Sequence, residues 1–221
     1  MKKFIVVAGN IGVGKSTLVG MLSERMGWQP FYEPVAENPY LADFYRDMSA
    51  WSFHSQIFFL THRLRMQYDL LRFPGSVVQD RSIYEDAEIF ANNLFLQGYI
   101  NERDYRTYHT LYRSLTEFLP APNLVIYLRA SVSTLVQRIA LRDRDFERTI
   151  SPSYLEQLNI LYEKWINNFT DCPVLTVPAD DLDYVKNAPH LDLIVKKVQE
   201  KLTGKDEVVF QPGEFLVPSE Q

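Results

Sequence analysis

The chain has 221 residues, of which 46% are hydrophobic and 23% are charged, and its formal net charge is −5. This composition suits one globular domain with a full core, and the acidic balance argues against a broad nucleic-acid-binding surface. One cysteine excludes a disulfide framework, and no apolar run approaches the roughly 18 residues of a membrane span. We therefore expect a cytoplasmic protein that binds neither a membrane nor nucleic acid.

Apolar runs typical of strands alternate with helical patterns along the whole chain. In chain order, strands are predicted at residues 3–8, 29–32, 76–80, 124–128 and 174–177. Helices are predicted at residues 15–26, 39–47, 51–71, 84–96, 101–119, 131–142, 154–169 and 191–202, with Ser153 and Glu156 spaced as a capping box. The alternation indicates an α/β fold with a parallel sheet covered on both faces. We expect one domain at residues 1–203 and a surface tail at residues 204–221.

A glycine-rich loop joins the first predicted strand to the first predicted helix. Residues 9–16 match the pattern G-x-x-x-x-G-K-[ST], in which backbone N–H groups cradle phosphates. The lysine of such a loop reaches the β- and γ-phosphates, and its hydroxyl residue ligates Mg²⁺. ATP binding, with Ser16 on the metal, is therefore predicted for Gly9, Asn10, Ile11, Gly12, Val13, Gly14, Lys15, Ser16 and Thr17. The motif alone does not separate kinases from GTPases, ATPases or transporters.

Two acidic residues follow predicted strands, at the sheet edge where ligands of α/β proteins bind. Glu33 comes after the second strand and could accept the proton of a hydroxyl nucleophile, although a solvated loop acid is the alternative. Asp80 ends the third strand and could bind Mg²⁺, while the adjacent Arg81 could stabilise a transferring phosphoryl group. The alternative for these two residues is an ion pair at the end of the strand that contributes little to stability.

Polar side chains lie on the long aromatic helix predicted at residues 51–71. Gln56 and Arg63 are seven residues apart, which is about two helical turns, so they share a face. A glutamine amide both donates and accepts hydrogen bonds and suits the edge of a nucleobase, and Asp86 could orient Arg63. The alternative is a helix whose polar groups face water and whose aromatic groups face the core.

An arginine cluster lies at the end of the helix predicted at residues 131–142 and just beyond it. The segment that follows is polar and could form a lid that closes arginines onto phosphates and excludes water. A solvated basic helix end, favoured by the helix dipole, is the alternative. The cluster consists of Arg138, Arg142, Arg144 and Arg148.

These motifs, in this order, resemble those of the deoxynucleoside kinase family, and its bacterial purine-type members look nearest. The motifs are residues 9–17, Glu33-Pro34-Val35, Trp51-Ser52-Phe53 with Gln56 and Arg63, residues 80–86, and the arginines of 138–148. The resemblance implies a P-loop kinase fold with a five-stranded parallel sheet surrounded by helices and an arginine-rich lid. It also implies a homodimer that uses ATP and Mg²⁺ to phosphorylate the 5′-hydroxyl of a deoxynucleoside in nucleotide salvage.

The resemblance also implies a role for each matching residue. Glu33 would act as the base at the 5′-hydroxyl, Arg81 and Lys15 would assist transfer, and Asp80 with Ser16 would hold the metal. The 3′-hydroxyl would be bound by Tyr45 and Glu147. The base would be recognised by Gln56, Arg63 and Asp86, and the donor phosphates by Arg138, Arg142 and Arg144.

The presence of both Arg63 and Asp86 resembles the purine and cytidine kinases more than the thymidine kinases. We therefore expect deoxyadenosine as the favoured substrate, with deoxycytidine and deoxyguanosine as close rivals. Phe59 is bulky for a position beside the base. Two other functions stay open from the sequence: a nucleoside monophosphate kinase, and a non-catalytic nucleotide-binding subunit.

Overall fold

The sheet is the centre of the molecule. The computed structural model describes residues 2–33, 37–144, 147, 149–205 and 208–215. In this part of the chain, five strands form one sheet in the order β2-β3-β1-β4-β5, and all of its pairs are parallel. The strands are β1 (Phe4–Gly9), β2 (Gln29–Phe31), β3 (Val77–Asp80), β4 (Leu124–Arg129) and β5 (Val174–Pro178). The predicted five-stranded parallel sheet is confirmed.

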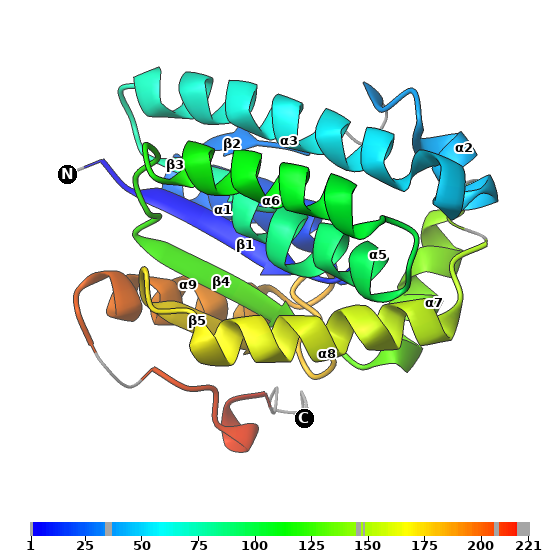
Figure 1. The fold of residues 1–221 in the computed structure, drawn as a ribbon. Helices are drawn as coiled ribbons and strands as arrows, with labels where there is room; N and C mark the ends of the chain where they lie inside the picture. Colours follow the sequence, from blue (N-terminus) through cyan, green and yellow to red (C-terminus); the bar gives the residue numbers. More distant parts are fainter. Residues whose placement is uncertain (1, 34–36, 145–146, 148, 206–207, 216–221) are drawn as a thin grey trace.

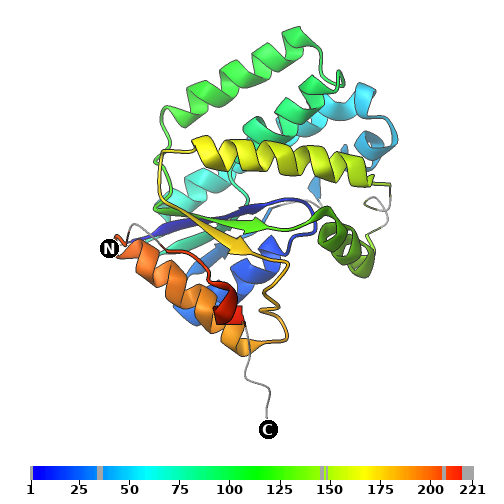
Figure 2. The same ribbon diagram turned by 90° about the horizontal axis from the view of Figure 1, so that it is seen from below.

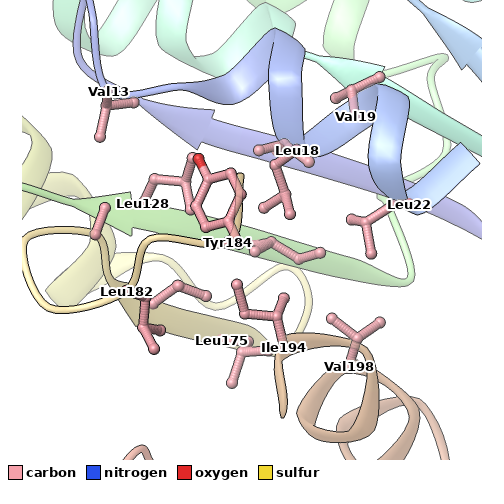
Figure 3. Close-up of a cluster of buried hydrophobic side chains, with 14 of the residues drawn as sticks. Val13, Leu18, Val19, Leu22, Leu128, Leu175, Leu182, Tyr184, Ile194 and Val198 are labelled. Atoms are coloured by element: carbon pink, nitrogen blue, oxygen red, sulfur yellow. The ribbon is translucent and has the colours of Figure 1, made fainter. Parts of the chain in front are cut away.

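Strand β1 shows why the sheet needs helices on both faces. It pairs with β3 on one side and β4 on the other, and all six of its residues are buried. Ile5 and Val7 belong to the core under α1 (Lys15–Met26) and α9 (Ala188–Leu202), whereas Val6 and Ala8 belong to a cluster on the opposite face. Figure 3 shows the first core, where side chains of α1, β4, β5 and α9 meet around the ring of Tyr184.

The other face carries the longer helices. Here α3 (Met48–Arg72) and α8 (Pro152–Asn168) cover the sheet, and α6 (Glu102–Thr116) lies further out (Figures 1 and 2). Between them run α4 (Ile83–Glu85), the π-helical segment η2 (Asp86–Ala91) and α5 (Asn92–Leu96). Two helices, α2 (Leu41–Arg46) and α7 (Val132–Arg142), stand at the end of the sheet towards which the strands point (Figure 1).

Two local expectations differ from the structure. The helix predicted at residues 84–96 contains the π-helical turn η2, which the apolar period does not reveal. The predicted capping box of Ser153 and Glu156 is wrong: α8 begins at Pro152, and the hydroxyl of Ser151 accepts the N–H of Tyr154 at 3.2 Å. Proline favours the first helical position because its φ is already helical and its missing N–H needs no partner there, so the cap falls on the residue before it.

The described part of the C-terminal tail packs against α9. Val208 is buried, and Phe210 and Phe215 lie against the core on the α1 side of the sheet. Lys197 of α9 donates to Glu214 at 2.8 Å, next to the short helix η4 (Pro212–Phe215). This packing differs from the expected surface tail, while the domain limit at residue 203 stays a prediction. None of the helices in the described ranges is long and apolar enough to cross a membrane.

Candidate active site

A pocket of about 320 Å³ opens beside the carboxyl ends of β1 and β3. Parallel sheets bind ligands at this edge, because the loops that leave the strands there surround a common crevice. The walls include residues of the glycine-rich loop, the strand-end residues and the polar residues of α3 and η2. The lining residues that the sequence singled out or that are discussed below are Gly12, Lys15, Ser16, Glu33, Tyr45, Gln56, Phe59, Asp80, Arg81, Asp86, Phe90, Arg142, Arg144 and Glu147.

The glycine-rich loop is shaped to receive an anion. Gly9, Gly12 and Gly14 have φ values of 144°, 82° and 106°, which residues with a side chain rarely adopt. A Cβ added to Gly9 would lie 2.7 Å from the backbone oxygen of Leu128, so the close approach to β4 also requires glycine. Gly14 precedes α1 without any side-chain cap. The first N–H groups of α1 are therefore open to phosphate oxygens.

Lys15 is buried at the start of α1. Its ammonium group donates to the backbone oxygen of Asn10 at 2.9 Å. Burial and, after it, the charge of Arg81 lower the pKa of Lys15 to about 8, while Asp80 and nearby glutamates oppose the shift. A bound polyphosphate would add negative charge and restore the ordinary, fully protonated ammonium group.

Ser16 and Asp80 meet at one side of the pocket. The hydroxyl of Ser16 donates to one oxygen of Asp80, and the other carboxylate oxygen, Oδ1, is buried without a hydrogen-bond partner among the described residues. A buried oxygen with a free lone pair beside a hydroxyl is a donor set that Mg²⁺ prefers, together with phosphate oxygens. The residues present therefore fit the predicted metal.

Glu33 is held between two arginines. Its Oε1 lies 3.0 Å from Nη2 of Arg63 and 3.0 Å from Nε of Arg81. Burial alone would raise the pKa of Glu33, but Arg81, Arg63 and Lys15 outweigh that effect and lower the pKa below its usual range. The carboxylate is therefore anionic at neutral pH, and it lines the same pocket as the glycine-rich loop.

Arg81 holds an unusual backbone conformation. Its φ is 65°, in the left-handed region that residues with a side chain rarely occupy. The guanidinium lies over the ring of Phe90, 4.2 Å from its centroid. Phe90 comes from the π-helical segment η2, as does Asp86, so this irregular turn supplies two walls of the pocket.

Arg63 stands behind the pocket wall rather than in it. Its side chain is 1% exposed, and its five hydrogen bonds use every N–H group of the guanidinium. The acceptors are the carboxylates of Glu33 and Asp86 and the backbone oxygens of Asp80 and Arg81. Arg63 thus orients Asp86, as the sequence suggests, but it does not line the pocket. Its predicted contact with a base stays a prediction.

Gln56 and Asp86 both line the pocket. The Oε1 atom of Gln56 is buried and has no hydrogen-bond partner in the described part of the chain. Burial raises the pKa of Asp86 to about 6, against the opposing effect of Arg63. An unpaired buried acceptor is costly, so a ligand that donates to it would gain affinity.

The predicted sugar and phosphate residues divide into two groups. Tyr45 and Glu147 line the pocket together with Arg142 and Arg144, and both arginines pair with Glu147, at 2.6 Å and 3.4 Å. Arg138 instead donates to the backbone oxygens of Val13 and Ala179, both at 2.7 Å, and does not line the pocket. It supports the glycine-rich loop from behind. Asp145, Phe146 and Arg148 lie outside the described residues, so the arginine-rich lid stays a prediction.

Sequence reasoning missed several residues of the site. It gave no role to Phe90, which no local pattern distinguishes from a core aromatic. It also missed the buried Glu85 and Tyr162, which bond to Gly9 and Arg81. Glu85 carried one usable signal, because Ser82 and Glu85 have capping-box spacing and form that motif in the structure. Tyr162 carried none.

The chain is similar to known proteins of one family. The deoxynucleoside kinase family model matches residues 5–203. The deoxyadenosine/deoxycytidine kinase of Bacillus subtilis (strain 168) is 41% identical over 196 residues, which cover 88% of this chain and 90% of that protein. The deoxyguanosine kinase of the same strain is 37% identical over 201 residues, which cover 89% and 96%.

A solved structure extends the likeness to the fold. The deoxyadenosine kinase from M. mycoides with bound dATP superposes with a TM-score of 0.79 at 33% identity. The match covers 89% of this chain and 99% of that chain. Together with the sheet and the glycine-rich loop, these likenesses confirm the predicted P-loop kinase fold.

Proposed function

This chain belongs to the deoxynucleoside kinase family and is an ATP-dependent deoxynucleoside kinase, and we propose that deoxyadenosine is its favoured acceptor, ahead of deoxycytidine and deoxyguanosine. The buried, unpaired Oε1 of Gln56 is the observation that carries the proposal. Adenine and cytosine carry an amino group on the base edge, where guanine and thymine carry a carbonyl oxygen. An acceptor in the pocket wall therefore favours the amino bases.

The surroundings of Gln56 support the same choice. Asp86 adds carboxylate oxygens to the pocket, whereas the donors of Arg63 are all taken by protein acceptors. A base carbonyl at this edge would face acceptors without a matching donor from Arg63, which costs affinity. The names of two relatives are consistent with deoxyadenosine as a substrate: one is a deoxyadenosine/deoxycytidine kinase, and another, from Lactobacillus acidophilus, a deoxyadenosine kinase, while the deoxyguanosine kinase of Bacillus subtilis keeps deoxyguanosine as a rival.

We propose the following roles in the transfer. The anionic Glu33 accepts a hydrogen bond from the 5′-hydroxyl and aims its oxygen at the γ-phosphate. Phosphoryl transfer passes through a loose transition state, so orienting the hydroxyl matters more than removing its proton early. The lowered pKa of Glu33 suits this role, because the carboxylate only has to accept a hydrogen bond. Lys15 and Arg81 stabilise charge on the phosphates, and Arg142 and Arg144, which line the same pocket, add positive charge.

Ser16 and Asp80 are the proposed ligands of Mg²⁺. When bound, the ion neutralises charge on the β- and γ-phosphate oxygens. Tyr45 and Glu147 are proposed to bind the 3′-hydroxyl, since both line the same pocket as Glu33. The homodimer expected from the resemblance remains a proposal.

A substrate panel tests the base preference. Purified protein is assayed with Mg-ATP and each of the four natural deoxynucleosides, with deoxyadenosine monophosphate as a further acceptor. We expect the highest kcat/KM for deoxyadenosine and no transfer to the monophosphate. Thymidine faster than the other three would contradict the reading of Gln56 and Asp86, and preferred transfer to the monophosphate would indicate a nucleoside monophosphate kinase.

A variant pair links the preference to Gln56. Gln56→Leu replaces the amide with methyl groups and so removes the acceptor, and kcat/KM for deoxyadenosine should fall at least about tenfold. Gln67→Leu is the matched control, because Gln67 is a buried glutamine of the same helix that bonds to Gln79 and does not line the pocket. Its kcat/KM should stay close to that of the wild type. Equal losses in the two variants would remove Gln56 from base recognition.

A further inference from the structure

Two buried side chains hold both backbone polar groups of Gly9, the first residue of the glycine-rich loop. The N–H of Gly9 donates to Oε1 of Glu85 at 3.1 Å, and its carbonyl oxygen lies 2.8 Å from the hydroxyl of Tyr162. Glu85 and Tyr162 are both 0% exposed and belong to α4 and α8. The entry of the loop is therefore tied to two helices on the opposite face of the sheet from α1.

The same two side chains also reach Arg81. The hydroxyl of Tyr162 accepts from Nη1 of Arg81 at 3.1 Å and lies 2.8 Å from Oε1 of Glu85. The second oxygen of Glu85 accepts the N–H of Ser82 at 2.8 Å, directly after the left-handed backbone of Arg81. Glu85 thus fixes the chain beside Arg81, and Tyr162 fixes its guanidinium.

This network connects the two halves of the pocket. Gly9 begins the loop that faces the donor phosphates, and Arg81 pairs with Glu33, the proposed contact of the acceptor hydroxyl. A displacement of about 1 Å at a reacting group can cost about 100-fold in rate. Neither Glu85 nor Tyr162 lines the pocket, so neither can act on a substrate directly.

We propose that Glu85 and Tyr162 are positioning residues for phosphoryl transfer, which hold Gly9 and Arg81 at a constant separation. The inference rests on the role proposed above for Arg81. It predicts that loss of either partner slows transfer while ATP and the deoxynucleoside still bind.

The test is Tyr162→Phe, which removes one oxygen and keeps the ring. We expect kcat to fall by about tenfold to 100-fold, with KM for ATP and deoxyadenosine within about threefold of the wild type. Tyr127→Phe is the matched control: this ring stacks on Tyr162 at 5.7 Å, is also buried, and bonds instead to Glu163. We expect a similar loss of thermal stability but an unchanged kcat.

A double variant separates positioning from general loosening. Arg81→Lys is combined with Tyr162→Phe, and each variant is also measured alone. If Tyr162 acts through Arg81, the double variant should lose much less activity than the product of the two single losses. Glu85→Gln keeps the shape of the side chain and should show the same kcat-specific loss as Tyr162→Phe.

The possible outcomes are distinct. A Tyr162→Phe protein with a kcat within about twofold of the wild type, or a Tyr127→Phe control that loses as much, would overturn the inference. Fully multiplicative losses in the double variant would overturn the action through Arg81. A wild-type protein that phosphorylates no deoxynucleoside would instead contradict the proposed function, and the inference with it.

Discussion

Lys15 is a residue of the site whose charge changes with pH just above neutrality. Its pKa in the free protein is lowered to about 8, mainly by burial, and polyphosphate binds the charged form. Below pH 8 the ammonium group is mostly protonated and ATP binds without cost. Above pH 8 the free protein must first take up a proton, so KM for ATP should rise by at most about tenfold per pH unit.

This pH dependence is measured as KM for ATP between about pH 7.5 and 9.5, where the charge on ATP is nearly constant. Lys15→Arg supplies the comparison, because a guanidinium stays charged throughout this range. Its KM can be higher overall but should not change with pH. A wild-type KM that is also flat over the range would contradict the lowered pKa of Lys15.

Single residues of the site could be predicted where a chemically suitable side chain stands at the end of a predicted strand. Glu33, Asp80 and Arg81 follow strands, and that placement alone brings them to the ligand edge of the sheet. Arg63 shows the limit of this reasoning. The helix face that carries it was predicted correctly, but whether Arg63 enters the pocket or stands behind it depends on acceptors from three other segments, namely Glu33, residues 80–81 and Asp86. Such long-range pairing leaves no local pattern in the chain.

At the scale of elements, the start of α8 offers a direct test. Ser151 caps this helix through its hydroxyl, while Ser153 lies inside the first turn. Ser151→Ala should lower the free energy of unfolding by about 0.5–2 kcal/mol, because the N–H of Tyr154 loses its acceptor. Ser153→Ala should change it by less than about 0.5 kcal/mol. Urea denaturation measures both, and a larger loss in Ser153→Ala would restore the capping box predicted from the sequence.

The existence of most elements could be predicted, because apolar periodicity is a local property. The strand of residues 124–128 and the helix of residues 15–26 match β4 and α1 closely. The π-helical turn η2 could not be predicted in this way. It contacts α3 and α6, and its Ala87 and Ala91 pack into a cluster with Leu60 and Tyr108. Packing of this kind selects one helical register over another without changing the apolar pattern.

At the scale of the whole molecule, the C-terminal segment contributes to the core. Deletion of residues 206–221 removes the buried Val208 and the packed rings of Phe210 and Phe215. We expect the free energy of unfolding to fall by about 2–4 kcal/mol. None of the segment's described residues, 208–215, lines the pocket, so kcat should stay within about twofold of the full chain. A truncated protein that keeps full stability but loses activity would assign the segment a role at the site instead.

The saturated guanidinium of Arg63 ties substrate choice to turnover. Arg63 holds both Asp86, which would face the base, and Glu33, which would face the sugar. A replacement of Asp86 that suits another base would also leave two of these donors unmatched in a dry interior. A new base preference in this scaffold therefore requires paired substitutions. One replaces Asp86 in the pocket wall, and the other supplies a new hydrogen-bond acceptor for Arg63.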